Sequence, residues 1–266
     1  MKKLFCTLLS VCLLAACHQK EAPNALKVGV IAGPEAEIMQ VAKQQAAKSG
    51  VTIKVIEFTD YAMPNQALSD GSIDANMFQH LPYLKQAMKA RGYQFNVLGK
   101  TFIYPMGVYS NKIKSLKALP AHALVAIPND PSNEARALLL LQSAGLLQLK
   151  SGAGWLATPR DIKTNPKQLQ FKELDAADLA RTLPDVSIAV INTNYAIPAG
   201  LSLNQALLHE QADSPYANLV VVRANDKRTK QLNILIQSLH SQAVFTAAKH
   251  LFHGAAMPAK NDKLKQ

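Results

Sequence analysis

The sequence predicts an α/β protein of two lobes that hold a ligand between them. Short β-branched apolar segments alternate with helix-like segments, which is typical of parallel strands covered by helices. One extended segment, 95–110, lacks a helical pattern and is long enough to cross from one lobe to the other. A final apolar strand returns late in the chain, at 219–222. Together these three observations favour two lobes over one large domain.

The N-terminus has the features of a bacterial export signal. Lys2 and Lys3 precede an apolar run at 4–14 that is far shorter than the roughly 20 residues a membrane span needs. The run ends in Leu-Ala-Ala-Cys17, which resembles a lipobox. We therefore expect a signal peptide at 1–16 and lipid attachment at Cys17, with an ordinary secretory signal as the alternative.

Composition limits the possible chemistry of the mature chain. Cys6 and Cys12 leave with the signal and Cys17 is used for the lipid, so no cysteine remains for a disulfide, a metal or thiol catalysis. With 48% hydrophobic residues, the chain can instead be stabilised by its core. The net charge of +11 comes from scattered lysines without a nucleic-acid-binding motif. We interpret it as a solvated surface, with some attraction to anionic lipid headgroups left open.

The first half of the mature chain begins with a polar tether at 17–25. Residues 26–32 alternate and are β-branched, and Gly33 and Pro34 end that strand before the next helix. A strand beginning at Ile73 is expected to end at Gln79 and His80. In this half we expect strands at 26–32, 51–58, 73–78 and 95–110, helices at 35–49, 82–91 and 113–119, and a loop leading into a short helix at 60–68.

A turn and helix at 127–141 contain the strongest local signal in the second half. Asp130 is a good N-cap and Pro131 suits the first helical position, so Asn133 and Arg136 lie in the first two turns. Gly145 is a plausible C-terminal cap. In this half we expect strands at 123–127, 169–174, 186–191 and 219–222, helices at 131–144, 176–181, 226–239 and 241–252, a loop at 146–161, and helix or loop at 197–208.

Arg136 is a candidate anchor for the acid end of a small molecule. Helix N-termini attract anions, and a guanidinium can bind a carboxylate with two hydrogen bonds. From this stretch alone, a solvated arginine paired with a nearby carboxylate is the more common situation.

Further candidate residues follow the carboxyl ends of expected strands, where open α/β sheets bind their ligands. They are Tyr61, Phe78, His80 and Tyr83 in the first half, and the amides of the stretch Asn192-Thr193-Asn194 in the second. For each aromatic the alternative is a place in the core, and for His80 it is a structural hydrogen bond.

Several kinds of enzyme are not indicated. There is no phosphate-binding or dinucleotide-binding glycine motif and no Gly-x-Ser-x-Gly elbow. His250 and His253 could share a helix face, but they lack a third ligand nearby, so we expect neither a metal nor another cofactor. The candidate polar groups suit binding rather than catalysis.

The chain resembles the NlpA-type lipoproteins over nearly the whole mature sequence. The resemblance rests on long, ordered motifs: Asp60-Tyr61-x-x-Pro64-Asn65-x-Ala67-Leu68, Ile73-Asp74-Ala75-Asn76-x-Phe78-Gln79-His80-x-Pro82-Tyr83-Leu84, Tyr104-Pro105-Met106-Gly107-x-Tyr109-Ser110, Ile127-Pro128-Asn129-Asp130-Pro131-Ser132-Asn133, Ala189-Val190-Ile191-Asn192 and Asp213-Ser214-Pro215-Tyr216-x-Asn218.

This resemblance implies a two-lobed periplasmic-binding-protein fold of the type II-like class, closing on one amino acid. It also implies a permease and an ATPase of a methionine ABC importer as partners. Arg136 would receive the ligand carboxylate, while Asn133, Asn218 and either Asn192 or Asn194 would hold its polar ends. Tyr61, Phe78, His80 and Tyr83 would surround the thioether, whose polarisable sulfur suits an aromatic environment.

We therefore expect a lipid-anchored, methionine-binding protein of the bacterial envelope that faces the periplasm, with outer-membrane or surface display left open. A binding protein for another amino acid or a peptide is one alternative, and an envelope interaction lipoprotein with this fold is another. The expected divisions are lobe 1 at 26–110 and 219–258, lobe 2 at 111–218, and a tail at 259–266.

Overall fold

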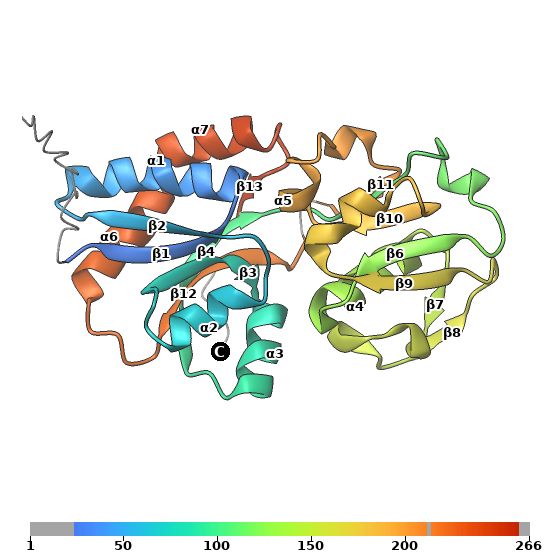
Figure 1. The fold of residues 1–266 in the computed structure, drawn as a ribbon, viewed down its shortest axis with the longest axis horizontal. Helices are drawn as coiled ribbons and strands as arrows, with labels where there is room; N and C mark the ends of the chain where they lie inside the picture. The colour runs from blue at the N-terminus through green and yellow to red at the C-terminus, as the bar shows by residue number, and fades with distance from the viewer. Residues whose placement is uncertain (1–23, 212–213, 261–266) are drawn as a thin grey trace, which may run out of the picture.

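The computed structural model describes residues 24–211 and 214–260. The expected signal peptide, the lipid-attachment residue Cys17, most of the tether and the end of the tail lie outside these residues. Within the described part, the chain forms two lobes, each built on its own sheet (Figure 1). The two-lobed α/β fold is confirmed.

The first lobe contains a six-stranded sheet in the order β13-β4-β12-β3-β1-β2. Strand β1 pairs in parallel with β2 and with β3, whereas β12 runs antiparallel to both β3 and β4. The bounds are β1 Leu26–Ile31, β2 Ile53–Phe58, β3 Ala75–His80, β4 Phe95–Ile103, β12 Ala217–Arg223 and β13 Met257–Pro258.

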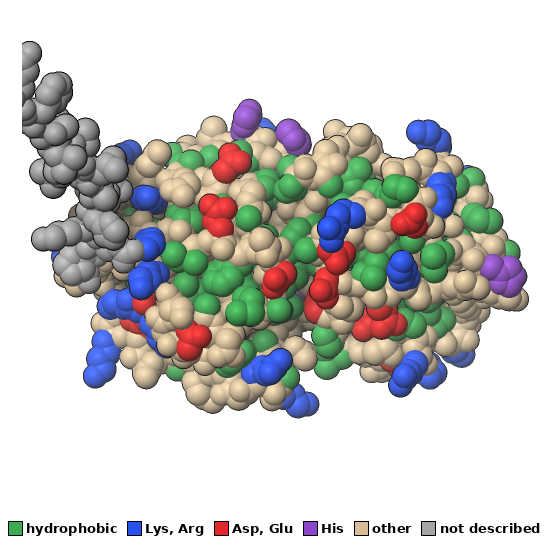
Figure 2. Space-filling view, viewed as in Figure 1, with side chains coloured by type: hydrophobic (Ala, Val, Ile, Leu, Met, Phe, Trp, Pro, Cys, Tyr) green, Lys and Arg blue, Asp and Glu red, His purple; other side chains and the backbone are tan. Residues whose placement is uncertain are grey.

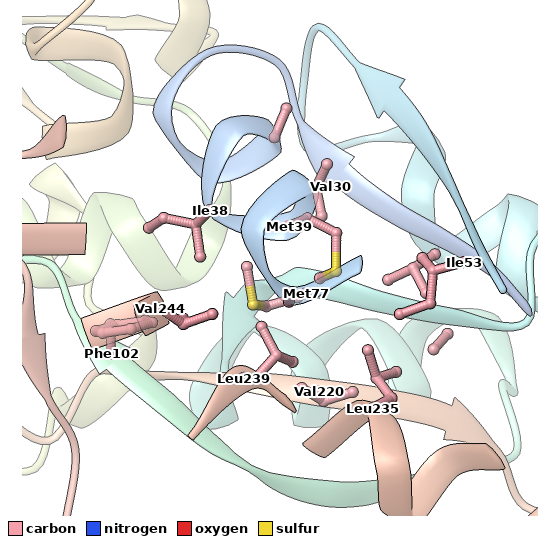
Figure 3. Packing of buried hydrophobic residues seen from close by; sticks show 14 of the residues in the cluster. Val30, Ile38, Met39, Ile53, Met77, Phe102, Val220, Leu235, Leu239 and Val244 are labelled. Atoms are coloured by element: carbon pink, nitrogen blue, oxygen red, sulfur yellow. The ribbon is translucent and has the colours of Figure 1, made fainter. Parts of the chain in front are cut away.

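Helices cover both faces of this sheet. Apolar residues of α1, α6 and α7 form one cluster with the central strands, which includes Met39, Met77 and Leu239 (Figure 3). On the opposite face, Leu68 and Leu84 bring α2 and α3 against the sheet. The bounds are α1 Pro34–Lys48, α2 Met63–Ser69, α3 Leu81–Arg91, α6 Thr229–Leu239 and α7 Gln242–Leu251. Burial of these apolar side chains drives the packing of the lobe.

The second lobe contains a five-stranded sheet in the order β11-β5-β10-β6-β9 and a two-stranded sheet of β7 and β8. Strand β6 lies between two parallel neighbours, β10 and β9. The bounds are β5 Gly107–Tyr109, β6 Leu124–Pro128, β7 Gln148–Leu149, β8 Ile162–Thr164, β9 Gln170–Leu174, β10 Ile188–Ile191 and β11 Leu208–His209, with helices α4 Pro131–Ser143 and α5 Thr193–Ala196.

The chain crosses between the lobes where the sequence predicts. Strand β4 belongs to the first sheet and β5 to the second, with a break at 104–106 between them. The chain returns to the first sheet at β12, which begins at Ala217. The expected single strand at 95–110 is therefore two strands. The lobe boundaries at 110 and 218 remain a proposal. Strand β5 lies before the first of these boundaries but already belongs to the second sheet.

Most expected elements are present, and the differences are local. The strand expected at 73–78 lies at Ala75–His80, two residues later. Only a 3₁₀ turn, Leu116–Ala118, forms within the helix expected at 113–119. The loop expected at 146–161 contains the short strand β7 and two 3₁₀ turns. Short segments of this kind take their structure from tertiary pairing rather than from their own pattern.

Figure 2 shows charged side chains of both signs on this face of the molecule, with several Lys and Arg side chains along its left and lower edges. This distribution fits the interpretation of the positive charge as a solvated surface. Among the described residues, no helix is both long and apolar enough to cross a bilayer.

Candidate ligand-binding site

A narrow cavity lies between the two lobes, and all nine residues predicted to form the site line it. They are Tyr61, Phe78, His80, Tyr83, Asn133, Arg136, Asn192, Asn194 and Asn218. Gln79, Tyr104 and Thr193 complete the lining. The strand ends account for this convergence, because β3 ends at His80, β10 ends just before Asn192, and β12 begins beside Asn218.

Direct hydrogen bonds hold the lobes together across the cavity. The Tyr61 hydroxyl donates to Asn194 Oδ1 at 2.7 Å, and His80 Nε2 lies 3.2 Å from Asn133 Oδ1. Tyr195 also donates from its hydroxyl to the carbonyl of Thr59 at 3.3 Å. The structure is therefore a closed form.

Local sequence explains how helix α4 presents its residues. Asp130 caps the helix by accepting from the Asn133 backbone N–H at 3.0 Å, and Pro131 occupies the first turn, as predicted. Gly145 adopts a positive φ of 71° after the helix, where glycine avoids the strain of the left-handed region. Arg136 follows one turn after Asn133, so both face the cavity.

Arg136 is buried, with 3% of its surface exposed, so it is not the solvated arginine of the alternative interpretation, although it does pair with a carboxylate as that interpretation expected. Its Nε donates to Glu210 Oε1 at 2.8 Å, and its Nη2 donates to Glu210 Oε2 at 2.5 Å. Nη2 also donates to the carbonyl of Tyr104 at 3.0 Å. Although burial would lower the pKa of Arg136, the Glu210 carboxylate raises it. Nη1 has no acceptor among the described residues, so it can bind a ligand carboxylate.

The guanidinium is also held from the side. Its central carbon lies 4.2 Å from the centre of the Tyr216 ring, a cation–π contact. Tyr216 packs in turn against His80, with ring centres 4.9 Å apart. These contacts restrict the rotamers of Arg136 and fix the position of its free nitrogen.

His80 is neutral, and its tautomer follows from its partners. Its Nδ1 accepts from the Tyr83 backbone N–H at 3.3 Å, which caps α3, so its Nε2 carries the proton and donates to Asn133. Burial, and then the charge of Arg136, lower the pKa of His80 to about 3. His80 thus acts as a fixed donor at neutral pH.

Asn133 is fully bonded inside the protein. Its Nδ2 donates to Asp130, and its Oδ1 accepts from both His80 and Asn192 Nδ2, the latter at 3.0 Å. This arrangement leaves Asn192 Oδ1 buried without a partner in the described part of the chain. Asn133 therefore orients Asn192, whose oxygen can accept a hydrogen bond from a ligand.

The two other amides each have one end available. Asn194 Oδ1 is occupied by Tyr61, whereas its Nδ2 is buried and unpaired within the described residues. Asn218 Nδ2 donates to Glu35 Oε1 at 3.0 Å, which leaves its Oδ1 available. Since buried polar atoms are normally paired, the unpaired Asn194 Nδ2, like Asn192 Oδ1, is a candidate contact for a ligand atom. Asn192 and Asn194 both line the cavity, one with a free acceptor and the other with a free donor.

Three aromatic rings form the apolar wall. The ring centres of Tyr61 and Phe78 lie 5.9 Å apart, those of Phe78 and Tyr83 5.6 Å, and those of Tyr61 and Tyr83 6.1 Å. The Tyr83 hydroxyl donates to the Tyr61 carbonyl at 2.8 Å, which fixes the loop before α2. Burial raises the pKa of each tyrosine, so the wall is uncharged.

Five residues of the site and its support were not predicted as site residues. Gln79 in β3 and Thr193 in α5 are sequence neighbours of predicted residues, and both line the cavity. Tyr104 lies at the crossing between the lobes. Glu35 and Glu210 come from segments distant in sequence. A buried arginine needs a carboxylate partner, and this was the only available sign of a residue such as Glu210. In the described ranges, no group of three or more His, Cys, Asp or Glu side chains is arranged to hold a metal ion.

Comparisons with known proteins agree with this geometry. The sequence model of the NlpA lipoprotein family matches residues 26–260. The chain is 47% identical over 249 residues to a Salmonella typhimurium protein described as D-methionine-binding lipoprotein MetQ, covering 92% of each chain. It is 45% identical over 241 residues to outer membrane lipoprotein 2 of Mannheimia haemolytica, covering 90% of this chain and 87% of the other.

Solved structures share the fold. A nutrient-binding protein from Burkholderia cenocepacia bound to methionine has a TM-score of 0.87 and 50% identity, covering 89% of this chain and all of that one. A periplasmic substrate-binding protein of an ABC transporter from Coxiella burnetii has a TM-score of 0.85 and 57% identity, covering 88% of this chain and all of that one. With this fold, the interlobe cavity and a family match across almost all of its described residues, the chain belongs to the NlpA lipoprotein family.

Proposed function

We propose that this protein captures methionine between its lobes and delivers it to an ABC importer made of a permease and an ATPase. The observation that carries the proposal is that one closed cavity contains both a free cationic donor and free hydrogen-bond acceptors. Arg136 offers a free guanidinium nitrogen, while Asn192 and Asn218 offer amide oxygens. A zwitterionic amino acid presents the complementary groups, a carboxylate and an ammonium.

The apolar wall supports methionine as the side chain. Tyr61, Phe78 and Tyr83 form an aromatic side of the cavity, and a thioether makes favourable contacts with aromatic rings. The names of relatives support the same ligand, since one is described as methionine-binding and another was solved with methionine bound.

Closure would couple binding to delivery. His80 and Tyr61 of the first lobe bond to Asn133 and Asn194 of the second, so the cavity is complete only when the lobes meet. A ligand that contacts both lobes binds the closed form better than an open one and shifts the population toward it. The closed form would then be the one presented to the permease.

The N-terminal motif supports anchoring of this protein in the cell envelope through a lipid on Cys17. Fractionation of cells that express the full chain and a Cys17→Ala variant tests this part of the proposal. We expect the full chain with the membranes and the variant in the soluble fraction. Equal membrane association of both would rule out the lipid anchor.

Calorimetry on protein that was unfolded, dialysed and refolded without ligand tests the binding proposal. We expect one methionine to bind per chain, and norleucine, which replaces the sulfur by a methylene, to bind more weakly. Both enantiomers of methionine should be titrated. A panel of other amino acids and methionine-containing dipeptides separates the alternatives, because stronger binding of any of them would replace methionine as the assigned ligand.

A further inference from the structure

Glu35 is a buried carboxylic acid directly behind the cavity wall, with 1% of its surface exposed. It lies in the first turn of α1, and its Oε1 accepts from Asn218 Nδ2 at 3.0 Å. Its Oε2 is shielded from solvent and has no partner among the described residues. One half of this carboxyl group is therefore unused.

The contact with Glu35 decides which way the Asn218 amide points. An ionised carboxylate can only accept hydrogen bonds, so it selects the NH₂ end of the amide. The carbonyl end, Oδ1, is then turned away from Glu35, on a residue that lines the cavity. If Glu35 were protonated, its O–H could instead bind Oδ1, and Asn218 could turn its NH₂ end toward the ligand.

Among the described residues, no cation forms an ion pair with Glu35. Arg136, the basic residue of the cavity wall, is engaged by Glu210. The other titratable groups that interact with Glu35 are the hydroxyls of Tyr61, Tyr104 and Tyr195. Burial raises the pKa of each of these hydroxyls, so they stay neutral.

A buried carboxylate with a free oxygen is costly unless a positive partner is supplied. Burial raises the pKa of Glu35 well above its usual value, and hydrogen bonding at Ile31 and Asn218 offsets only part of this rise, so the carboxyl group ionises readily only when a cation lies nearby. A ligand ammonium placed at Asn218 would offset the cost, because it would lie beside the amide oxygen and close to the carboxylate. Arg136 would hold the opposite end of the same ligand.

We propose that Glu35 is a positioning residue that makes the cavity selective for ligands with a free α-ammonium group. It does so by holding the Asn218 carbonyl oxygen toward the ligand and by supplying the balancing negative charge. The inference rests on the proposed binding of methionine and adds the residue that recognises its ammonium end.

The test compares methionine with 4-(methylthio)butanoate, which keeps the carboxylate and thioether but lacks the ammonium. Calorimetry gives the ratio of the two dissociation constants for the wild type and for Glu35→Gln, which keeps the shape and an acceptor for Asn218 but removes the charge. Loss of a charge-assisted interaction is expected to reduce the preference for methionine by about tenfold or more. Glu37→Gln, on the exposed face of the same helix, is the matched control and should keep the wild-type ratio.

A double variant, Glu35→Gln with Asn218→Asp, exchanges the amide and the carboxylate and should restore part of the preference. The inference is overturned if Glu35→Gln keeps the wild-type ratio, or if it weakens both ligands by the same factor, as a purely structural role would. Circular dichroism shows whether each variant folds.

Should the substitutions prevent folding, the wild type alone still tests whether the cavity recognises the ammonium group. Equal affinity of the wild type for the two ligands would overturn the inference. Absence of methionine binding by the wild type would instead overturn the proposed function itself.

Discussion

Replacing Arg136 by methionine removes the positive charge of the cavity while keeping a long side chain. In the wild type, the guanidinium binds Glu210 through Nε and Nη2 and leaves Nη1 for the ligand. Truncating one partner of a buried, hydrogen-bonded charge pair costs about 2–5 kcal/mol. We therefore expect the affinity of Arg136→Met for methionine to fall by about 30-fold or more.

The same substitution also affects stability. It leaves the partly buried Glu210 without its partner, a change that costs up to about 3–5 kcal/mol for a fully buried pair and less when the orphaned acid takes up a proton. Glu210 retains the Met106 N–H, which donates to its Oε2 at 3.0 Å. Adding Glu210→Gln removes the unpaired charge, so the double variant should regain stability without regaining affinity.

Calorimetry measures the affinity, and thermal unfolding without ligand measures the stability. Arg181→Met is the matched control, because Arg181 is exposed and its ion pair with Asp178 should contribute little. Binding of methionine by Arg136→Met within about threefold of the wild type would refute the role of Arg136 as the carboxylate anchor. Recovery of affinity in the double variant would refute it as well.

Three further predictions concern single residues. Tyr61→Phe removes the 2.7 Å bond to Asn194 between the lobes and should weaken methionine binding by about tenfold without changing the apo stability much, as calorimetry and thermal unfolding can show. His80 has a folded-state pKa of about 3, below its unfolded value, so its contribution to stability is present above about pH 6.5 and is lost as the pH falls toward 3. In denaturant titrations the wild type should lose up to about 1.4 kcal/mol of unfolding free energy per pH unit from this source, and His80→Gln should not show this loss. Burial and then Glu173 raise the pKa of Glu134 to about 7, above its unfolded value, so its contribution is present below about pH 4.5 and is lost as the pH rises through 7; Glu134→Gln should stabilise the protein more at pH 8 than at pH 5, and an equal effect at both would contradict this.

Local features of the fold could be predicted because their causes are close in sequence. The cap of α4 joins Asp130 to Asn133, three residues on, and the strand breaks follow glycine and proline. His80 and Asn192 were expected to lie together because ligand sites of α/β sheets collect at strand ends, and the family resemblance added Asn218.

The supporting carboxylates could not be predicted in this way. Glu210 is 74 residues from Arg136, and Glu35 is 183 residues from Asn218, so neither contact has a sequence period. Their positions depend on the crossing between the lobes and on the pairing of β12, which places Asn218 opposite His80. Sequence patterns and the family resemblance therefore predicted residues that line the cavity, whereas the three-dimensional structure was needed to show which of their atoms are free.

Mass spectrometry of the small molecules released by denaturing the freshly purified protein tests the central claim most directly. The closed cavity, with Arg136 at one end and the free amide oxygens at the other, predicts methionine in an amount close to one per chain from the wild type. It predicts much less from an Arg136→Met sample purified in parallel. Release of a different amino acid or peptide from the wild type, or equal methionine from both samples, would contradict the account.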